Sequence, residues 1–308
     1  MEIVRKSLCV FIHYSKNLQI PKYVSVYVDE LSNYFDQVIL VTNHRELESE
    51  FNTSTPNIST LFVKNEGYDL GMFYKVFQTI DSTEYSKIAC INDSNILINE
   101  LKPVFEWSKT SPSDFWGIID SYEKPWFSTH MDNYHIQSHF IVFNRKAIEK
   151  LPLFFNSLNI QHILDEADPV KLRQKVINQW EIGLSRFMIQ QGLLPGSYID
   201  SQAYSLKYLS GKQTNVGHKL YAELIQSGYP LIKKKVITKS NWKDSFRLSL
   251  KWKKLIRQYG NQEWEIESII NELIQIKIDT ENQSVNKYKK KILDRYHSLF
   301  KIKNNLHK

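Results

Sequence analysis

The stretch KIACINDSNILI, from Lys87 to Ile98, changes from apolar to polar and back again. Ile88 to Ile91 are consecutive apolar residues, the pattern of a parallel strand that is buried on both faces. Asn92, Asp93 and Ser94 follow at the point where this strand should end. In open α/β sheets, ligands bind in the crevice outside the carboxyl ends of the strands. We therefore expect Asp93 to face a ligand rather than the core.

Strand and helix patterns alternate along the first hundred residues, which indicates an α/β fold with a mostly parallel central sheet and helices on its faces. The second half is less regular, with a polar and aromatic loop over residues 120–134. The predicted strands are Ser7–Tyr14, Gln37–Thr42, Ile58–Val63, Asp114–Ile119 and His135–Phe143. The predicted helices are Pro21–Phe35, Gly71–Ile80, Lys146–Leu158, His162–Val176, Gln179–Gln191 and Gly217–Ser227.

The chain changes character near residue 239. Residues 239–308 carry 16 Lys and Arg against 8 Asp and Glu, whereas residues 1–238 carry 24 against 25. The tail shows only helical patterns, and one of them places Leu248, Trp252, Leu255 and Tyr259 in an apolar stripe beside a basic face. We predict a near-neutral domain over residues 1–238 and a basic C-terminal helical extension over residues 239–308.

Composition narrows the class of protein. Of the 308 residues, 42% are apolar and 13% aromatic, which is typical of an ordered globular chain. The first residues lack the apolar segment of a signal peptide, so the cytoplasm is the expected compartment. Cys9 and Cys90 fall in predicted buried strands, where free cysteines act as small apolar residues. The near-neutral body disfavours nucleic acid as a partner.

A second polar segment, Asn65 to Gly71, lies between a predicted strand and a predicted helix. Gly67 and Gly71 would let the backbone approach a ligand, and the N-terminus of the helix would favour an anion such as a diphosphate. Asp69 has the alternative reading of a helix N-cap. If Asp69 and Asp93 close neighbouring strands, they converge on one crevice that suits a nucleotide or a divalent cation.

Six short motifs occur in order: NEGYDLGMF, INDSNIL, FWGIIDS, HIQSHFIVF, WEIGLSRFMIQQG and GYPLIKKKVI. Together they resemble the rhamnan synthesis F family of bacterial polysaccharide glycosyltransferases, with a fold similar to GT-A. The resemblance spans residues 62–237 and fits the first strand, and it leaves the tail after Lys239 outside. It implies transfer of a sugar, rhamnose in the family's namesake, from a nucleotide donor to a growing surface glycan.

GT-A enzymes usually hold a divalent cation with an Asp-x-Asp motif, and the matching place here reads Asn92-Asp93-Ser94. Asp93 is therefore the candidate ligand for Mg²⁺ or Mn²⁺, or else it binds hydroxyl groups of the donor without a metal. Without a metal, the leaving diphosphate needs another cation, and Lys233 in the run Lys233 to Lys235 is the candidate. The alternative for this run is a solvated edge strand.

Inversion at an anomeric carbon needs a general base. The resemblance points to Glu181, which we place in the first turn of a helix, where an acidic residue is also favourable for the helix dipole alone. Asp120 is the second candidate base. His135, Gln137 and Ser138 are the candidate acceptor ligands. His135 and Gln137 should share one face of their strand.

We therefore expect a GT-A-like glycosyltransferase that is cytoplasmic and peripheral on the inner membrane. Its expected partners are a nucleotide-sugar donor and a glycan or lipid-linked glycan acceptor. The C-terminal helices would bind an anionic membrane surface, or else pack their apolar stripe on the body. The alternative function is a catalytically silent carbohydrate- or nucleotide-binding module.

Overall fold

A computed structural model describes residues 5–16, 18–51, 55–238 and 242–280 of the chain. Its centre is a sheet with strand order β3-β2-β1-β4-β8-β6-β7, and β9 pairs with β6 beside this path. The pairs among β1 to β4 and the β6–β9 pair are parallel, whereas β8 runs antiparallel to both β4 and β6. The sheet strands are β1 Lys6–His13, β2 Gln37–Thr42, β3 Ile58–Phe62, β4 Tyr85–Asn92, β6 Phe115–Ser121, β7 His135–Ile136, β8 Phe140–Asn144 and β9 Pro195–Ile199.

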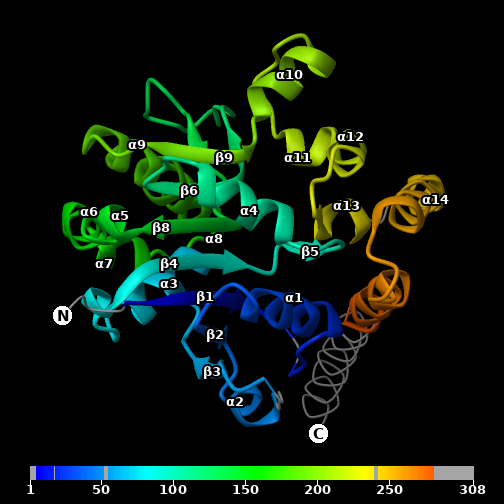
Figure 1. The fold of residues 1–308 in the computed structure, drawn as a ribbon, viewed down its shortest axis with the longest axis horizontal. Helices are drawn as coiled ribbons and strands as arrows, with labels where there is room; N and C mark the ends of the chain where they lie inside the picture. The colour runs from blue at the N-terminus through cyan, green and yellow to red at the C-terminus, as the bar shows by residue number, and fades with distance from the viewer. Residues whose placement is uncertain (1–4, 17, 52–54, 239–241, 281–308) are drawn as a thin grey trace, which may run out of the picture.

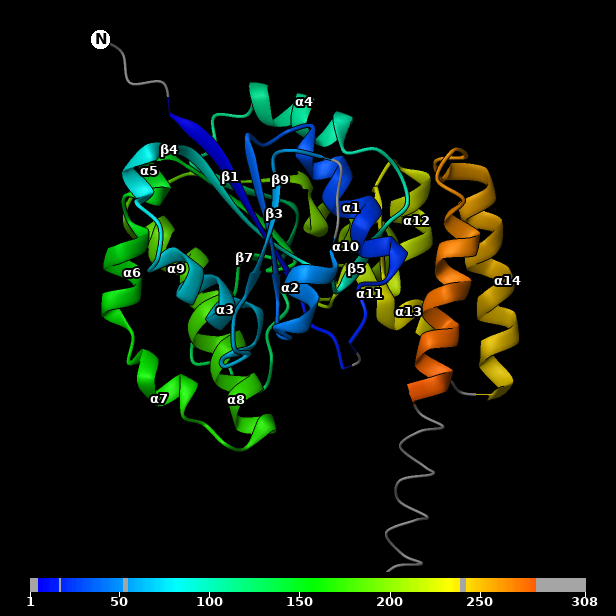
Figure 2. The same ribbon diagram turned by 90° about the horizontal axis from the view of Figure 1, so that it is seen from below.

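Helices cover both faces of this sheet (Figure 1; Figure 2). Along β1, Cys9 and Phe11 belong to one apolar cluster and Leu8 and Val10 to the other, because side chains alternate between the faces of a strand. The first cluster includes side chains of α1 Lys22–Ser32, α4 Lys102–Thr110 and α12 Tyr221–Gln226. The second includes side chains of α3 Tyr68–Phe77, α5 Arg145–Ile148, α6 Leu151–Ser157, α7 Ile160–Leu164 and α9 Gly183–Gln190.

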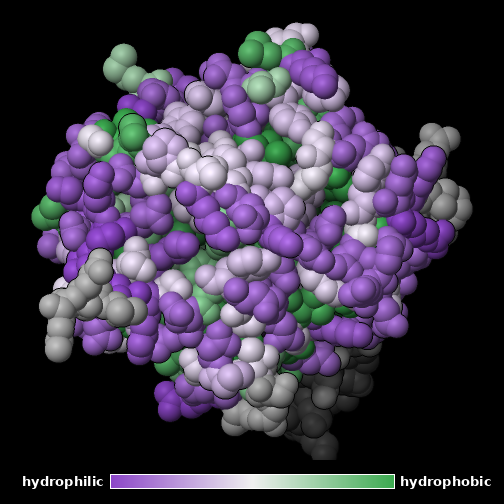
Figure 3. Space-filling view, in the orientation of Figure 1, coloured by the Kyte–Doolittle hydropathy of each residue, from purple (hydrophilic) through white to green (hydrophobic). Residues whose placement is uncertain are grey.

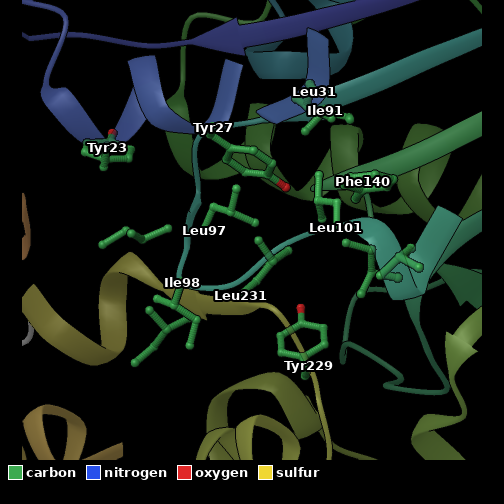
Figure 4. Close-up of a cluster of buried hydrophobic side chains, with 14 of the residues drawn as sticks. Tyr23, Tyr27, Leu31, Ile91, Leu97, Ile98, Leu101, Phe140, Tyr229 and Leu231 are labelled. Atoms are coloured by element: carbon green, nitrogen blue, oxygen red, sulfur yellow. The ribbon is translucent and has the colours of Figure 1, made fainter. Parts of the chain in front are cut away.

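The remaining elements are short. The strands β5 Asn95–Leu97 and β10 Leu231–Lys233 form a separate antiparallel pair, with Lys233 opposite Asn95. Leu97 of β5 and Leu231 of β10 belong to the first cluster, together with Tyr27 and Tyr229 (Figure 4). The other helices are α2 Glu46–Glu50, η1 Ser82–Glu84, α8 Pro169–Lys175, η2 Val176–Ile182, α10 Ser201–Leu209, α11 Val216–Lys219 and α13 Lys234–Thr238.

The predicted fold class is confirmed: the chain is a mixed α/β protein with a mostly parallel central sheet and a helical C-terminal region. The predicted strand at Gln37–Thr42 coincides with β2, and α1 starts directly after Pro21, which is its N-cap. The two cysteines are free and buried, as expected. Ile88 to Ile91 of β4 are at most 1% exposed, so the strand is buried on both faces.

Two predicted elements are wrong in ways that affect the site. The helix predicted from Gly71 begins at Tyr68, so Asp69 and Gly71 lie within its first turn rather than in a loop. The strand predicted over His135–Phe143 is divided into β7 and β8 by a turn at Ser138 and His139. Because β7 ends at Ile136, Gln137 lies outside the strand, and the expectation that His135 and Gln137 share one strand face is wrong.

The tail begins with α14 Trp242–Tyr259, and a further helix covers residues 266–280. Trp252 and Leu255 are 1% and 6% exposed and belong to the same apolar cluster as α1 and β5. The Asn261 N–H donates to the Ile98 carbonyl at 2.8 Å, which ties the tail to the segment after β5. The division at residue 238 stays a prediction. The side chain of Leu248 lies outside the described residues. The helical pattern of the tail also predicts a helix over Ser284–Lys301, and this segment lies outside them too.

Candidate active site

A cleft of about 470 Å³ opens at the carboxyl edge of β4 and β6. Its walls come from the residues after these two strands, from the turn between β7 and β8, from α8 and η2, and from β10. Eight of the predicted site residues line it, although they come from five separate segments of the chain. They are Asp69, Asn92, Ser94, His135, Gln137, Ser138, Glu181 and Lys233.

Asp93 does not line this cleft, contrary to the prediction. Its side chain is turned inward, and it is 6% exposed. The Oδ2 atom lies 2.6 Å from Nδ1 of His13, accepts from the Tyr23 hydroxyl at 2.8 Å, and accepts from Nζ of Lys234 at 2.9 Å. Burial raises the pKa of Asp93, but Lys234 and His13 outweigh burial and hold the pKa well below its usual range.

The backbone explains this inward turn. The Asp93 N–H donates to the Ile12 carbonyl at 3.1 Å, which continues the pairing of β4 with β1 for one more residue. The Lys234 N–H donates to the Ser94 carbonyl at 3.0 Å, which continues the pairing of β10 with β5. Asp93 is therefore fixed between the end of β1 and the end of β10, where His13 and Lys234 project.

These contacts do not suit Asp93 as a ligand of a divalent cation. Its Oδ2 atom already receives three hydrogen-bonding groups, and Lys234 supplies a full positive charge beside it. Within the described ranges, no group of three or more His, Cys, Asp or Glu side chains is arranged to hold a metal ion. The prediction of a metal at Asp93 therefore disagrees with the chemistry of the residues around it.

Asp69 meets Asn92 in the cleft, whereas the sequence predicted that Asp69 and Asp93 would converge there. Asp69 reaches it from the first turn of α3 rather than from the end of a neighbouring strand. Nδ2 of Asn92 donates to Oδ2 of Asp69 at 2.8 Å. Burial raises the pKa of Asp69 to about 7, with a further rise from the charges of Asp93 and Glu181 and an opposing effect from Lys234.

The two glycines near Asp69 serve packing instead of ligand approach. Gly67 has φ of +77° and is the N-cap of α3. A Cβ atom at Gly71 would lie 1.9 Å from the Glu66 carbonyl oxygen, so any side chain there would displace the backbone. Neither glycine lines the cleft, and neither does Asn65, so the donor-binding assignment of these three residues is not supported by their positions.

Glu181 lines the cleft from η2, a π-helical segment. The prediction that Glu181 opens a helix is wrong, because α8, η2 and α9 are continuous and begin after Asp168, the N-cap. A favourable position in a first helical turn therefore does not explain this glutamate. π-helical turns occur often at functional sites. Oε1 of Glu181 accepts from the Ser138 hydroxyl at 2.9 Å and from the Ser138 N–H at 3.2 Å.

Lys233 also lines the cleft, so the run Lys233 to Lys235 is not a solvated edge strand. Nζ of Lys233 donates to Oε1 of Gln137 at 3.0 Å and to Oδ1 of Asn215 at 3.1 Å, which are both neutral groups. Burial lowers the pKa of Lys233 to about 8, while the charges of Glu181 and Glu123 raise it. Lys233 is more buried than Arg173 and Lys235, which also line the cleft and are both exposed.

Asp120, the second candidate base, is buried away from the cleft. It is 4% exposed, and its Oδ1 atom accepts from the Ser201 N–H at 2.7 Å at the start of α10. Burial raises the pKa of this carboxyl, and hydrogen bonds from Ser201 oppose the rise. Asp120 joins β6 to α10, so its position does not support a role as a base.

The histidines of the β7–β8 turn lie in the wall of the cleft with other partners. Nδ1 of His135 lies 2.7 Å from the Asn133 carbonyl oxygen. Nε2 of His139 lies 3.1 Å from the Tyr229 hydroxyl, and burial holds the pKa of His139 well below its usual range. Nε2 of Gln137 donates to the Asp120 carbonyl at 3.2 Å. Gln137 thus links the position of Lys233 to β6.

Several lining residues were not singled out in the sequence. No pattern in the sequence marks Arg173 of α8 or Asn215 before α11 as a site residue, because tertiary packing brings their segments to the cleft. The loop after β6 was predicted as polar and aromatic, and this composition is the one signal that points to Phe127. The lining residues outside the predicted set include Tyr68, Glu123, Phe127, Arg173, Asn215, His218 and Lys235.

The family described as rhamnan synthesis protein F matches residues 38–307. The chain belongs to this family. Membership in the rhamnan synthesis protein F family supports a transferase role in polysaccharide biosynthesis. The match includes the C-terminal helices, so the expectation that the tail lies outside the family is wrong, while β1 lies outside the matched residues. No curated protein matches the chain.

Some solved structures are similar at low sequence identity. The glycosyltransferase GlyE of Streptococcus pneumoniae TIGR4 is 12% identical with a TM-score of 0.40, and the match covers 86% of this chain and 64% of GlyE. HddC of Yersinia pseudotuberculosis is 16% identical with a TM-score of 0.32, covering 47% and 80% of the two chains. The inositol-1-phosphate CTP transferase of T. maritima is 10% identical with a TM-score of 0.36, covering 63% and 85%.

Proposed function

We propose that this chain is a GT-A-like glycosyltransferase that moves a sugar, rhamnose in the simplest reading of the family's description, from a nucleotide donor to a growing bacterial surface polysaccharide. The observation that carries the proposal is the composition of one cleft. Lys233, the hydrogen-bonded pair Asp69 and Asn92, and Glu181 held by Ser138 all line it. A cation for a diphosphate, polar groups for hydroxyls and a carboxylate for a proton are the groups that such a transfer requires.

The donor lies on the side of the cleft formed by the ends of β4 and β10. Asn92 and Ser94 offer amide and hydroxyl groups to the ribose or the sugar, and Asp69 offers a carboxyl beside them. Lys233 projects from β10 toward the diphosphate. Its hydrogen bonds to Gln137 and Asn215 fix the ammonium group without neutralising its charge.

Glu181 acts as the general base. The acceptor hydroxyl oxygen forms a bond to the anomeric carbon while the bond from that carbon to the diphosphate oxygen breaks, and the diphosphate leaves with the electron pair. Glu181 takes the hydroxyl proton, and attack from the face opposite the leaving group inverts the configuration. Ser138 donates two hydrogen bonds to Oε1 of Glu181 and thereby fixes the carboxylate.

The acceptor glycan approaches along the β7–β8 turn and the loop after β6. Ser138 and His135 line the cleft on this side, and Gln137 supports Lys233 behind them. Phe127 lines the rim, and the neighbouring Trp126 is 86% exposed. An exposed aromatic ring beside a polar cleft offers a flat apolar surface to a sugar ring, whose C–H groups stack on such faces.

A panel of nucleotide sugars tests this proposal. A donor that binds the folded chain raises its apparent stability by mass action, by about 2.7 kcal/mol at a hundredfold excess over the dissociation constant. We expect one donor to raise the melting temperature and to be hydrolysed slowly without an acceptor. The inward position of Asp93 favours one alternative, a catalytically silent binding module. Stabilisation without turnover on any glycan acceptor would support that module and contradict the transferase.

We also place the chain in the cytoplasm, peripheral on the inner membrane. Within the described residues, no helix is both long enough and apolar enough to cross a bilayer. Trp252 of α14 is buried in the protein, so the expected insertion of its apolar stripe into a membrane is wrong for this residue. Lys251, Lys254 and Arg257 are exposed, and basic side chains near an anionic leaflet contribute about 1 kcal/mol each.

Vesicle co-sedimentation tests the membrane surface as a partner. We expect the full chain to bind anionic vesicles at low salt and to release them at high salt, because exposed charges are screened. Replacing Lys251 and Lys254 with glutamine should weaken this binding, whereas the same change at Lys102 and Lys109 of α4 should not. Equal binding by both variants, or none by the unaltered chain, would contradict the proposal.

A further inference from the structure

Two adjacent lysines at the end of β10 use their charges in opposite ways. Nζ of Lys234 lies 2.9 Å from Oδ2 of Asp93 and 2.9 Å from the Tyr23 hydroxyl, in a partly buried ion pair. Among the residues that the structure describes, Nζ of Lys233 donates hydrogen bonds only to the neutral side-chain oxygens of Gln137 and Asn215. Lys233 is the last residue of β10 and Lys234 the first of α13, so the backbone changes direction between them and the two side chains reach different surroundings.

The negative charge of Asp93 is therefore balanced by a positive charge within the protein, that of Lys234. His13 and Lys234 both contact the same carboxylate oxygen, and the side chain of Asp93 is 8% exposed. A divalent cation placed on this carboxylate would lie beside the ammonium group of Lys234, which repels it. Such a cation would need to displace Lys234, and the partly buried ammonium group would then lose its partner, which costs free energy.

The positive charge of Lys233, in contrast, lies in the cleft without an ion pair to any carboxylate of the described residues. Gln137 and Asn215 orient the ammonium group and leave its charge available to an anion. Arg173 lines the same cleft from α8, and within the described ranges its guanidinium forms no hydrogen bond or ion pair. A desolvated cation fixed by neutral acceptors binds a phosphate strongly, because no internal partner competes for it.

We infer that the cleft binds the diphosphate of its nucleotide sugar without a divalent cation, using Lys233 as the fixed cationic ligand and Arg173 as a second one. This inference rests on the proposed function. In this arrangement, the Asp93–Lys234 pair acts as a neutral internal support, and Lys233 stabilises the charge that develops on the leaving diphosphate. The GT-A resemblance implies a metal site at Asp93, but the residues around Asp93 do not fit a metal. This disagreement is the reason for inferring a binding mode without a cation.

The test measures binding directly. The full chain is titrated calorimetrically with uridine, guanosine and deoxythymidine diphosphates, once in EDTA and once in excess Mg²⁺ or Mn²⁺. We expect at least one diphosphate to bind with the same dissociation constant in both buffers. Lys233→Met should weaken this binding about tenfold to a hundredfold, which corresponds to the loss of a hydrogen bond to a charged group.

Two further variants separate charge from structure. Lys233→Arg keeps a positive charge at this place and should retain most of the affinity that Lys233→Met loses. Lys102→Met removes one exposed lysine from α4, outside the cleft, and should bind as the unaltered chain does. If Lys233→Met binds as tightly as the unaltered chain, Lys233 is not the ligand and the inference is overturned.

The role of the metal has its own outcomes. Binding that appears only with Mg²⁺ or Mn²⁺ would overturn the inference while leaving the proposed glycosyltransferase intact. Failure of every diphosphate to bind in either buffer would overturn both, since the proposed function itself requires a nucleotide site. Binding in EDTA together with the loss in Lys233→Met supports both.

Discussion

The cleft and the neighbouring network around Asp93 both contain carboxylates and lysines, but these groups have different hydrogen-bond partners. The network consists of Asp93, His13, Tyr23 and Lys234. Beneath the cleft, the charges of Asp93 and Lys234 neutralise each other. In the cleft, Glu181 is held by Ser138 and Lys233 by Gln137 and Asn215, which are all neutral. Residue type and position near a strand end therefore do not distinguish a supporting group from a reactive one, whereas the identity of the hydrogen-bond partners does.

The largest effect that follows from this comparison is on turnover. Glu181→Gln keeps an oxygen that can accept both hydrogen bonds of Ser138 but cannot take a proton. Turnover should fall about a hundredfold to ten-thousandfold, and donor affinity should stay unchanged. Steady-state kinetics and calorimetry with the same donor measure the two quantities. Glu106→Gln, an exposed change on α4, is the matched control.

Weakened donor affinity in Glu181→Gln, with turnover preserved at saturation, would contradict the assignment of this residue as the base. It would make Glu181 a ligand of the donor. The contrast between a reactive carboxylate in the cleft and a supporting one beneath it would then no longer hold.

The network beneath the cleft should respond in stability instead. Asp93→Asn leaves the partly buried ammonium group of Lys234 without its carboxylate; removal of one partner of a fully buried ion pair costs about 3 to 5 kcal/mol, so the loss should lie at or below the lower end of that range. Urea denaturation should show this loss. The double variant Asp93→Asn with Lys234→Met should recover part of it, because the unpaired charge is removed.

An exposed catalytic aspartate would behave differently in that experiment. Unchanged urea midpoints in Asp93→Asn would mean that the carboxylate faces solvent, as the sequence alone suggested. The comparison between the two regions would then be wrong.

Asp69 lies between the two regions and should make stability depend on pH. Its pKa is about 7 in the folded chain against a usual value of 3.8, so the folded chain binds a proton that the unfolded chain has lost between these values. The contribution of Asp69 to stability is therefore highest below the lower value and decreases as pH rises to about 7. Asp69→Asn should remove this decrease.

Urea midpoints of both proteins across pH 4 to 7 measure the difference between their slopes. Parallel curves would show that burial, Asp93 and Glu181 do not raise the pKa of Asp69 in the way that the geometry implies.

The smallest effect concerns Ser138. Ser138→Ala removes the hydroxyl that donates to Glu181 at 2.9 Å and keeps the backbone N–H at 3.2 Å. One such hydrogen bond contributes about 0.5 to 1.5 kcal/mol, so turnover should fall by no more than about tenfold. Initial rates at saturating donor measure this change, and a loss as large as that of Glu181→Gln would give Ser138 a role of its own.

The sequence predicts the strands of the sheet well where burial is complete. β1, β2 and β4 contain runs of apolar residues that are mostly buried, so the positions of these strands follow from residue type. β9 escapes prediction because Pro195-Gly-Ser-Tyr-Ile199 is neither apolar nor alternating, and pairing with β6 alone defines it.

The site is predicted less completely, for a physical reason. Asn92 and Ser94 line the cleft as their strand-end position suggests, but Asp93 between them turns inward. That turn depends on Lys234, which is far along the chain and approaches through the pairing of β10 with β5. A single sequence contains the residues of such an ion pair but no signal that brings them together.

The surface also shows why composition alone does not locate the site. On the face drawn in Figure 3, hydrophilic residues predominate and hydrophobic ones form small separate patches. The cleft is lined by both kinds, including Phe127 beside charged groups. Its identity rests on the geometry of a few polar side chains rather than on a broad property of the surface.

The π-helical segment η2 limits how the length of this chain can vary. Glu181 accepts from the Ser138 N–H, and four residues later the hydroxyl of Ser185 accepts from the Ile136 N–H at 3.0 Å. Since an α-helix turns about 100° per residue, deleting one residue between Glu181 and Ser185 would rotate one of these two anchors away from its partner. We therefore expect insertions and deletions to accumulate in the loops around α7 and to be selected against between residues 181 and 185.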